Sequence, residues 1–446
     1  MAPFPGAAQP APPPADAEPH RSPSQDPPAP FDPLQGIDPN GRIPRAEIPD
    51  DIERPDRWRY IPEGRLKPGN VFQRLFVSSF LVPIVFRESD VGTGGGIALT
   101  DIDFRNQRRR EFAGFFLTYT SEGQQNFSMV WRRWLHHREL PDGGVLQEER
   151  SFLRGRAGYS KTLTRRFFGF GADSDEHDES SYSDELAQIE LGVERALPGP
   201  GGDWVLSLGL RGELHRLGSG SVDDEPDTRD AFARAFRASR DADLGWVEAA
   251  LRWDTRDSQA LPYRGSMFSA WTSFAPLQGG GDVGMTYGFE GQHLIPLPGL
   301  LHSGGDPEEE HPPTDSLALG ARLTGSAGNL PFFSLPTLGG AFGQRGYIAG
   351  RFRDGAAWLG VAEYRFWVLP RGFPITRTIR IERVGLAPFY EIGSVAGDIP
   401  RLFESRVIHS YGIGARLTLE RTAPFRIDVG FSEEGVEVHA RFGLSF

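Results

Sequence analysis

Residues 436–446, VEVHARFGLSF, alternate strictly between apolar and polar side chains. Successive side chains of a β-strand point to opposite faces, so the stretch predicts a strand with one apolar and one polar face. The polar face carries Glu437, His439 and Arg441. The apolar face carries Val436, Val438, Ala440, Phe442, Leu444 and Phe446. A strand of this kind needs apolar surroundings on one side only.

The same alternation recurs in the two preceding segments, 408–420 and 424–432. Their polar faces hold charges and glycines, including Arg416, Arg426 and Asp428. In a soluble sheet the apolar face would pack inward, but no all-apolar partner segments accompany these strands. A charged, wet lumen with an apolar outer surface explains the pattern better, so we expect an all-β, transmembrane antiparallel β-barrel. A large soluble β-protein is the alternative.

The composition agrees with many membrane-crossing strands. The mean hydropathy is -0.39, and the chain has no run of about eighteen apolar residues that could form a membrane-crossing helix. A strand crosses a bilayer with about 9–11 residues and shows lipid only every second side chain. The 446 residues include 55 Gly and 32 Phe, which suits tight turns and outward aromatic rings.

Alternating segments number about sixteen, and bacterial outer-membrane barrels have an even number of strands. Residues 1–74 are rich in proline and cannot bury a core, so we expect a disordered or extended periplasmic N-terminal tether there. The barrel is expected over residues 75–446. The expected strands are 79–87, 94–104, 112–121, 125–137, 149–160, 183–197, 203–216, 243–254, 265–275, 282–296, 315–326, 356–369, 383–394, 408–420, 424–432 and 435–446.

Charge and cysteine content exclude several kinds of protein. The net charge of -12 argues against nucleic acid as a partner. The absence of cysteine excludes disulfides, thiolate metal sites and cysteine nucleophiles. No Ser, His and carboxylate arrangement and no G-x-S-x-G motif is found, so we expect no enzyme, no cofactor and no metal. The acidic run from Asp173 to Glu179 could attract Ca²⁺, but such a run is typical of a solvated loop.

One arginine stands among glycines in the long connection 327–355. Arg345 lies between Gly343 and Gly346. Glu363 and Glu391 lie in the next two expected strands, at positions whose side chains point to the lumen because alternate residues of a strand face opposite sides. A loop folded back inside the barrel would let the guanidinium of Arg345 reach both carboxylates, for which its planar fork of donors is suited.

These residues also carry a resemblance to a family. The stretches LPTLGGAFGQRGY (335–347), AEYRF (362–366) and FYEIGSV (389–395) resemble the bacterial surface antigen superfamily, which includes BamA- and TamA-type outer-membrane assembly factor barrels and two-partner secretion transporters. The resemblance implies that Arg345, Gly346 and Tyr347 form the tip of a long extracellular loop folded into the lumen. It implies that Glu363 and Glu391 are the acidic partners of that tip. Gln344 departs from the branched apolar residue usual in the family.

Further segments agree with the same family. RWDTRDSQALPYRGS (252–266) resembles its periplasmic turn, with Asp254, Arg256, Asp257, Pro262 and Gly265 in pattern. The Phe-rich segment that ends at Tyr182 also resembles one in the family. The alternating Phe442, Leu444 and Phe446 resemble the C-terminal signal for outer-membrane insertion.

The resemblance implies a function and a location. We expect a bacterial outer-membrane barrel that takes part in outer-membrane protein insertion and assembly or in polypeptide translocation. Its expected partners are outer-membrane lipid and lipopolysaccharide, and either client outer-membrane proteins or a separate periplasmic partner. A passive pore or structural barrel is the alternative function. The expected contacts of Arg345 with Glu363 and Glu391 also allow two interpretations: a structural lock that holds the loop inside the barrel, or a latch whose release opens the barrel.

Three features near the ends of the chain bear on these expectations. Residues 1–74 do not show the helix and strand pattern of the POTRA domains that usually precede such barrels, so we expect a member that lacks them. The N-terminus, MAPFPGAAQP, has no secretory signal, which we expect to have been removed. Pro83 in the first strand and Gly443 in the last weaken strand pairing, so the seam between these strands is a candidate gate. Equally, Pro83 could mark a strand start or a bulge.

Overall fold

The computed structural model describes residues 32, 34–66, 80–88, 92–101, 103–279, 281–306, 308–375, 380–419 and 423–444. For residues 80–88, 92, 93, 419, 423 and 442 the description covers the backbone alone. None of the helices in these ranges is long and apolar enough to cross a membrane.

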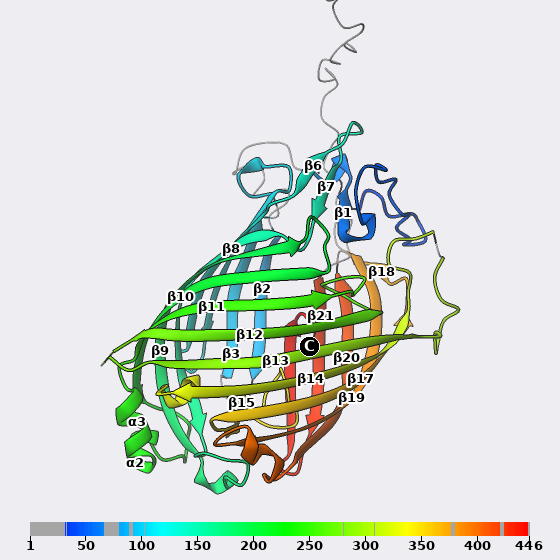
Figure 1. The fold of residues 1–446 in the computed structure, drawn as a ribbon. Helices are drawn as coiled ribbons and strands as arrows, with labels where there is room; N and C mark the ends of the chain where they lie inside the picture. Colours follow the sequence, from blue (N-terminus) through cyan, green and yellow to red (C-terminus); the bar gives the residue numbers. More distant parts are fainter. Residues whose placement is uncertain are drawn as a thin grey trace, which may run out of the picture. The chain divides into compact units, whose positions relative to one another are not determined.

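Within these ranges, sixteen long strands and the two-residue β18 (Phe373–Pro374), which pairs with β19, form one antiparallel sheet that curves into a barrel (Figure 1). Each strand pairs with the next one along the chain, so the expected all-β barrel is confirmed. The strands are β2 (Phe80–Glu88), β3 (Gly92–Asp101), β4 (Glu111–Thr120), β5 (Gln125–Trp134), β8 (Phe152–Phe167), β9 (Ser180–Leu197), β10 (Trp204–Ser219), β11 (Asp243–Asp254), β12 (Gly265–Gln278), β13 (Gly284–Leu297), β14 (Asp315–Gly328), β17 (Ala356–Leu369), β19 (Arg380–Ala396), β20 (Ile408–Leu419), β21 (Ala423–Phe431) and β22 (Val436–Phe442).

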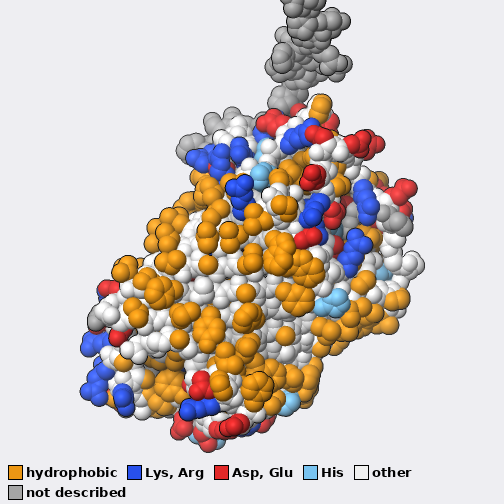
Figure 2. Space-filling model, in the orientation of Figure 1, with side chains coloured by type: hydrophobic (Ala, Val, Ile, Leu, Met, Phe, Trp, Pro, Cys, Tyr) orange, Lys and Arg blue, Asp and Glu red, His pale blue; other side chains and the backbone are white. Residues whose placement is uncertain are grey.

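Alternation along the strands separates an apolar outer face from a polar inner face. In β10 the outward Leu206, Leu208 and Leu210 are 37%, 46% and 59% exposed. In β17 the inward Glu363 and Arg365 are buried. Figure 2 shows hydrophobic side chains spread over the outer face, with charged residues gathered toward its two ends. This distribution matches a barrel with lipid outside and a polar interior.

The two edge strands differ in part from the expectation. Strand β22 ends at Phe442, because the next residue, Gly443, has a φ of 94° and so leaves the extended conformation. The strand expected over 435–446 is therefore shorter. Pro83 lies inside β2, opposite Ile97 in a continuous register, and is neither a strand start nor a bulge. Among the strand pairs with a described register, none joins β22 to β2.

A small second sheet stands at one rim of the barrel. It consists of β1 (Trp58–Ile61), β7 (Val145–Glu148) and β6 (His137–Glu139), in the order β1, β7, β6. Ile61, Leu66 and Val145 form its apolar core. Composition did not indicate that β1 pairs with β7, because β1 lies within the proline-rich segment 1–74. Residues 1–31 lie outside the described residues, so the tether there stays a prediction.

The N-terminal segment also lies along a long turn of the barrel. The amide of Arg45 donates to the carbonyl of Glu308 at 3.0 Å, and the amide of Glu310 donates to that of Ile43 at 2.7 Å. The connection 298–314 has 17 residues, the same number as 135–151 at this rim, and these bonds give its length a structural role. Its length serves to pair with residues 43–45.

A short helical connection joins β10 and β11 at the opposite rim. It contains α2 (Thr228–Ala231) and α3 (Ala233–Ser239), and the Asp227 side chain caps the first helix. Phe236 of α3 packs into an aromatic cluster with Phe167, Tyr182, Leu217 and Phe332. The Phe-rich segment singled out in the sequence thus lies where this connection meets the long loop that follows β14.

Candidate functional site

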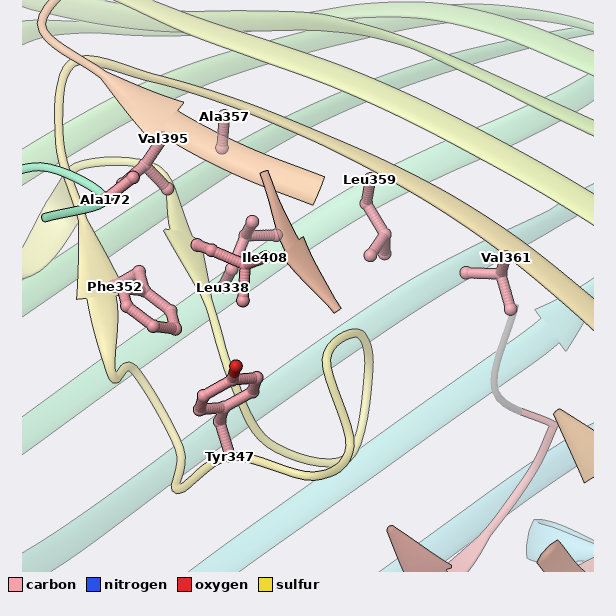
Figure 3. Packing of buried hydrophobic residues seen from close by; sticks show 9 residues of the cluster. All are labelled: Ala172, Leu338, Tyr347, Phe352, Ala357, Leu359, Val361, Val395 and Ile408. Carbon is pink, nitrogen blue, oxygen red and sulfur yellow. The ribbon is translucent and has the colours of Figure 1, made fainter. Parts of the chain in front are cut away.

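The connection between β14 and β17, residues 329–355, returns into the barrel. It contains η5 (Phe332–Ser334) and a short hairpin of β15 (Thr337–Leu338) and β16 (Phe352–Arg353). Figure 3 shows Leu338, Tyr347 and Phe352 of this loop beside side chains that point inward from the barrel wall. The wall contributes Ala357, Leu359, Val361, Val395 and Ile408 to the cluster. Burial of these side chains holds the loop against the inner surface.

The tip of the loop turns with left-handed backbone angles. Gly340 has a φ of 94° and Gln344 a φ of 60°. The side-chain Nε2 of Gln344 donates to the carbonyl of Ile408 at 3.0 Å, a contact that helps to hold this residue other than glycine in the left-handed region. Gln344, the departure from the family pattern, thereby gains a polar contact with β20.

Arg345 is 0% exposed and contacts both expected carboxylates. Its Nε lies 2.8 Å from Glu391 Oε1, and its Nη1 lies 2.9 Å from Glu363 Oε2. Its backbone amide donates to the other oxygen of Glu391 at 2.6 Å. The guanidinium carbon lies 3.4 Å from the centroid of the Phe389 ring. The structure therefore brings together Arg345, Glu363 and Glu391 as the sequence indicated.

The ion network is larger than the sequence analysis indicated. Asp428 of β21 lies 3.4 Å from Arg345 Nη1 and also pairs with Arg416 and Arg426. Arg365 pairs with Glu363 at 2.8 Å. Three carboxylates and four arginines thus occupy one buried cluster. Parity placed Arg416, Arg426 and Asp428 on the lumen face, but only the register between strands shows that they meet Arg345.

The backbone of the tip lies directly on β21. A Cβ atom added at Gly346 would lie 2.4 Å from the carbonyl oxygen of Phe431, and one added at Gly430 would lie 2.2 Å from that of Arg345. Ser432 Oγ donates to the carbonyl of Gly346 at 2.7 Å. His439 Nε2 of β22 donates to the carbonyl of Arg345 at 3.1 Å. The tip therefore touches the last two strands of the sheet.

The flanks of the tip are fixed as well. Arg351 Nε donates to Glu434 at 2.8 Å, and Nη1 donates to Ser174 Oγ at 2.9 Å. Tyr347 is buried, and its hydroxyl lies 3.5 Å from Glu433 Oε1. Burial, together with Glu433 and Glu434, raises the pKa of Tyr347, so the ring stays neutral. These contacts join the loop to two other connections at the same rim.

The turn motif of residues 254–265 is an ordered structure at the opposite rim. Arg256 forms two bonds to the carboxylate of Asp254, at 3.0 and 2.9 Å. Asp257 accepts from the amides of Tyr263 and Arg264 at 3.1 and 3.3 Å. Gly265 has a φ of 100°, and Pro262 is buried.

Arg150, which alternation and motifs do not single out, organises the same rim. Its guanidinium donates to the backbone carbonyls of Gly202, Asp254 and Arg256 at 3.0, 2.7 and 3.3 Å. Burial lowers the pKa of Arg150 to about 10, which still leaves it charged at neutral pH. An arginine directly before a strand gave no distinct signal in the sequence.

The acidic run from Asp173 to Glu179 and the C-terminal residues were also singled out in the sequence. Asp175 of the acidic run accepts from the amide of His177 at 2.9 Å and so orders a short turn. Within the described ranges, no group of three or more acidic or histidine side chains could hold a metal ion. Leu444 lines a cavity of about 260 Å³ with the inward-facing Leu359 and Val361. Phe446 and the side chains of Pro83 and Phe442 lie outside the described residues, so the insertion signal and the seam stay predictions.

The chain is similar to known outer-membrane proteins. The model of the Omp85 superfamily domain matches residues 84–446. CdiB from Escherichia coli shares 11% identity with a TM-score of 0.54, covering 82% of this chain and 62% of that chain. BamA from Haemophilus ducreyi lacking POTRA domains 1–3 shares 13% identity with a TM-score of 0.49, covering 80% of this chain and 67% of that chain. CdiB from Acinetobacter baumannii shares 11% identity with a TM-score of 0.48, covering 82% and 59%.

These matches concern the barrel fold and only part of the length of the similar proteins. The chain spans about three fifths of the length of the two CdiB chains. The likeness to the Escherichia coli protein is one of fold. No curated protein sequence matches the chain.

Proposed function

Because the chain belongs to the Omp85 superfamily of outer-membrane β-barrels, we propose that it inserts proteins into the outer membrane or translocates polypeptides across it. The family relationship confirms the resemblance drawn from residues 335–347, 362–366 and 389–395. The role in insertion or translocation is the step beyond it.

One observation supports the proposal most strongly. The loop tip, Arg345 to Tyr347, reaches through the barrel interior to carboxylates on β17, β19 and β21. A tip held by buried ion pairs between several strands couples the position of the loop to the arrangement of those strands. A loop that served only to cover the barrel mouth would not need charges on three strands of the wall.

The proposed mechanism uses the end of the sheet that the tip touches. The carbonyl of Arg345 binds His439 of β22, the last strand. A shift of the tip therefore acts directly on the strand edge at which a client strand could pair. We expect a periplasmic partner or the N-terminal segment to deliver the client to that edge.

Reconstitution tests this function. The full chain is placed in lipid vesicles, and a urea-unfolded eight-stranded outer-membrane barrel is added as the probe client. We expect folding of the probe to be faster than in empty vesicles, and the acceleration to be lost in Arg345→Gln. An Arg240→Gln variant is the control, because Arg240 is a surface residue whose side chain is 66% exposed.

A passive pore is the second candidate. The lumen carries ion pairs such as Arg252 with Glu194 and Arg211 with Glu248, which would line a polar path. In this case the vesicles would conduct ions while the probe folded no faster than in empty vesicles. That pair of results would contradict insertion and support the pore.

A further inference from the structure

The N-terminal segment runs along the rim of the barrel that lies opposite the long loop. Figure 1 shows its strand β1 beside β7, at the end of the barrel away from α2 and α3. Residues 41–66, which we call the rim strap, contact six turns between barrel strands. One residue that the strap contacts in each of these turns is, in chain order, Arg109, Asp142, Gly201, Arg256, Glu308 and Arg371. The strap therefore joins turns that are distant in the sequence.

One end of the rim strap is firmly attached to the barrel. Residues 58–66, the anchored end, include β1, which pairs with β7 over four residues. Ile61 and Leu66 are buried with Val145 in an apolar core. Ladder hydrogen bonds and apolar burial act together here, so this end should stay on the barrel.

The other end is held by weaker and more exposed contacts. Residues 41–45, the releasable end, form two backbone hydrogen bonds with residues 308–310, of 3.0 and 2.7 Å. Arg42 pairs with Asp306 at 3.5 Å, but the two side chains are 47% and 40% exposed. An exposed ion pair contributes little to stability. Because segments with few buried contacts open first in local unfolding, the releasable end should separate from the rim before the anchored end does.

The releasable end closes a cavity inside the barrel. Ile43 lines a cavity of about 50 Å³ together with the inward-facing Arg365 and Arg416. These two arginines pair with Glu363 and so belong to the ion cluster around Arg345. If Ile43 moved away from the rim, water would enter the cavity from this side.

We propose that the rim strap is a hinged cover of the lumen, whose releasable end leaves the rim while the anchored end stays on β7. Between the two ends, Asp51 pairs with Arg138 at 2.7 Å, with side chains that are 65% and 45% exposed. This stretch can therefore follow the releasable end. Next to it, Arg54 has a φ of 57°, in the left-handed region that residues other than glycine rarely adopt. Such a bend is suited to absorb the backbone rotation of a hinge.

Opening of the cover would act on the loop tip as well as on the lumen. Water in the cavity would raise the local dielectric constant and weaken the ion pairs of Arg365 and Arg416 with Glu363. Because Glu363 also binds Arg345, a movement of the strap at one rim would loosen the loop that enters from the other rim. The inference concerns access to the lumen, so it goes beyond the proposed function and does not depend on a client protein.

The test ties the releasable end to the rim with a disulfide. The chain contains no cysteine, and Pro44 faces Glu309 in an antiparallel bridge. Facing residues of antiparallel strands have Cα atoms about 4.5–5.5 Å apart, which a disulfide can bridge. The releasable-end variant is therefore Pro44→Cys with Glu309→Cys. The full chain is oxidised in air and inserted into planar lipid bilayers, and its ionic conductance is measured before and after addition of dithiothreitol.

Two controls accompany this variant. Tyr60→Cys with Leu146→Cys places the same kind of disulfide at the anchored end, where these residues face each other in the pairing of β1 with β7. Glu309→Cys alone controls for the loss of the ion pair between Glu309 and Arg371. Gel mobility before and after heating shows that each barrel is folded, and mass spectrometry confirms each disulfide.

We expect the conductance of the releasable-end variant to rise about tenfold or more on reduction, to the level of the Glu309→Cys variant. The conductance of the anchored-end variant should be the same with and without dithiothreitol, because that end does not move. Equal conductance of the releasable-end variant before and after reduction would overturn the hinged cover. Absence of conductance after reduction would overturn it as well, since release of the strap would then not open the lumen.

Discussion

Replacement of Arg345 by glutamine should release the loop from the barrel wall. The side chains of Arg345, Glu363, Glu391 and Asp428 are at most 1% exposed. In the part of the chain that the structure describes, Arg345 is the ion-pair partner of Glu391, whose other contact is the hydroxyl of Ser410 at 2.9 Å. Removal of one partner from a buried ion pair costs about 3–5 kcal/mol, because the remaining charge stays buried without compensation.

The other carboxylates of the cluster keep arginine partners. Arg365 and Arg416 stay on Glu363, and Arg416 and Arg426 stay on Asp428. The loss of stability in Arg345→Gln should therefore come mainly from the unpaired carboxylate of Glu391. We expect the double variant Arg345→Gln with Glu391→Gln to be less destabilised than the sum of the single variants, since the unpaired carboxylate is gone.

Two assays measure the effect. Equilibrium unfolding in lipid vesicles with denaturant gives the free energy of unfolding. Limited trypsin digestion reports the loop, because Arg351 and Arg353 are 2% and 8% exposed and should become cleavable when the tip is released. Arg240→Gln, an exposed control, should stay within about 0.5 kcal/mol of wild type. If Arg345→Gln unfolds with the wild-type free energy and keeps its loop protected, the ion network does not hold the loop.

Three further variants test other parts of the structure. Gly430→Ala should destabilise the protein by about 1–3 kcal/mol, since its Cβ would lie 2.2 Å from the Arg345 carbonyl oxygen, whereas Gly212→Ala should not; denaturant unfolding of both checks this. Arg150→Met removes donors from three backbone carbonyls, so proteolysis should cut the turns at that rim faster than in wild type, and unchanged digestion would count against this role. Burial raises the pKa of Asp257, so the stability it contributes is complete below its ordinary pKa and is lost as pH rises through the raised value. Asp257→Asn keeps the acceptor for two amides, and its stability relative to wild type should be greater at pH 8 than at pH 4; an equal difference at both would contradict the burial argument.

The strand content of the barrel was predictable because alternation is a local property. All sixteen expected segments form strands, and their bounds differ by at most four residues except at β8, which ends seven residues later than expected, at Phe167. The small sheet of β1, β7 and β6 was not predictable, because its strands are three or four residues long and β1 pairs across more than eighty residues of chain. The sequence does carry a signal for the helical connection that contains α2 and α3: Asp227, an N-cap residue type, precedes an alanine-rich run with Phe232 and Phe236 four residues apart.

The candidate site was predictable in part for a related reason. Alternation assigns a side chain to the lumen, and it placed Glu363 and Glu391 correctly. It does not give the height of a residue along the barrel, which depends on strand register. The pairing of Gly414 with Asp428, and of Arg416 with Arg426, brings those charges level with Arg345. Alternation also gives no information on Arg150, because this residue binds the carbonyls of turns that are distant in the sequence.

The central claim is that this barrel acts on other polypeptide chains at the edge of its sheet, and crosslinking in living cells tests it most directly. A photo-crosslinking residue is placed at Val82 or Ile84 in β2, with Val247 on the outer face of β11 as the control, since it is 48% exposed and distant from the sheet edge. We predict that mass spectrometry of the adducts at β2 identifies other outer-membrane proteins or a periplasmic partner, which are absent at Val247. Adducts at β2 that contain only β22 of the same chain would contradict the claim.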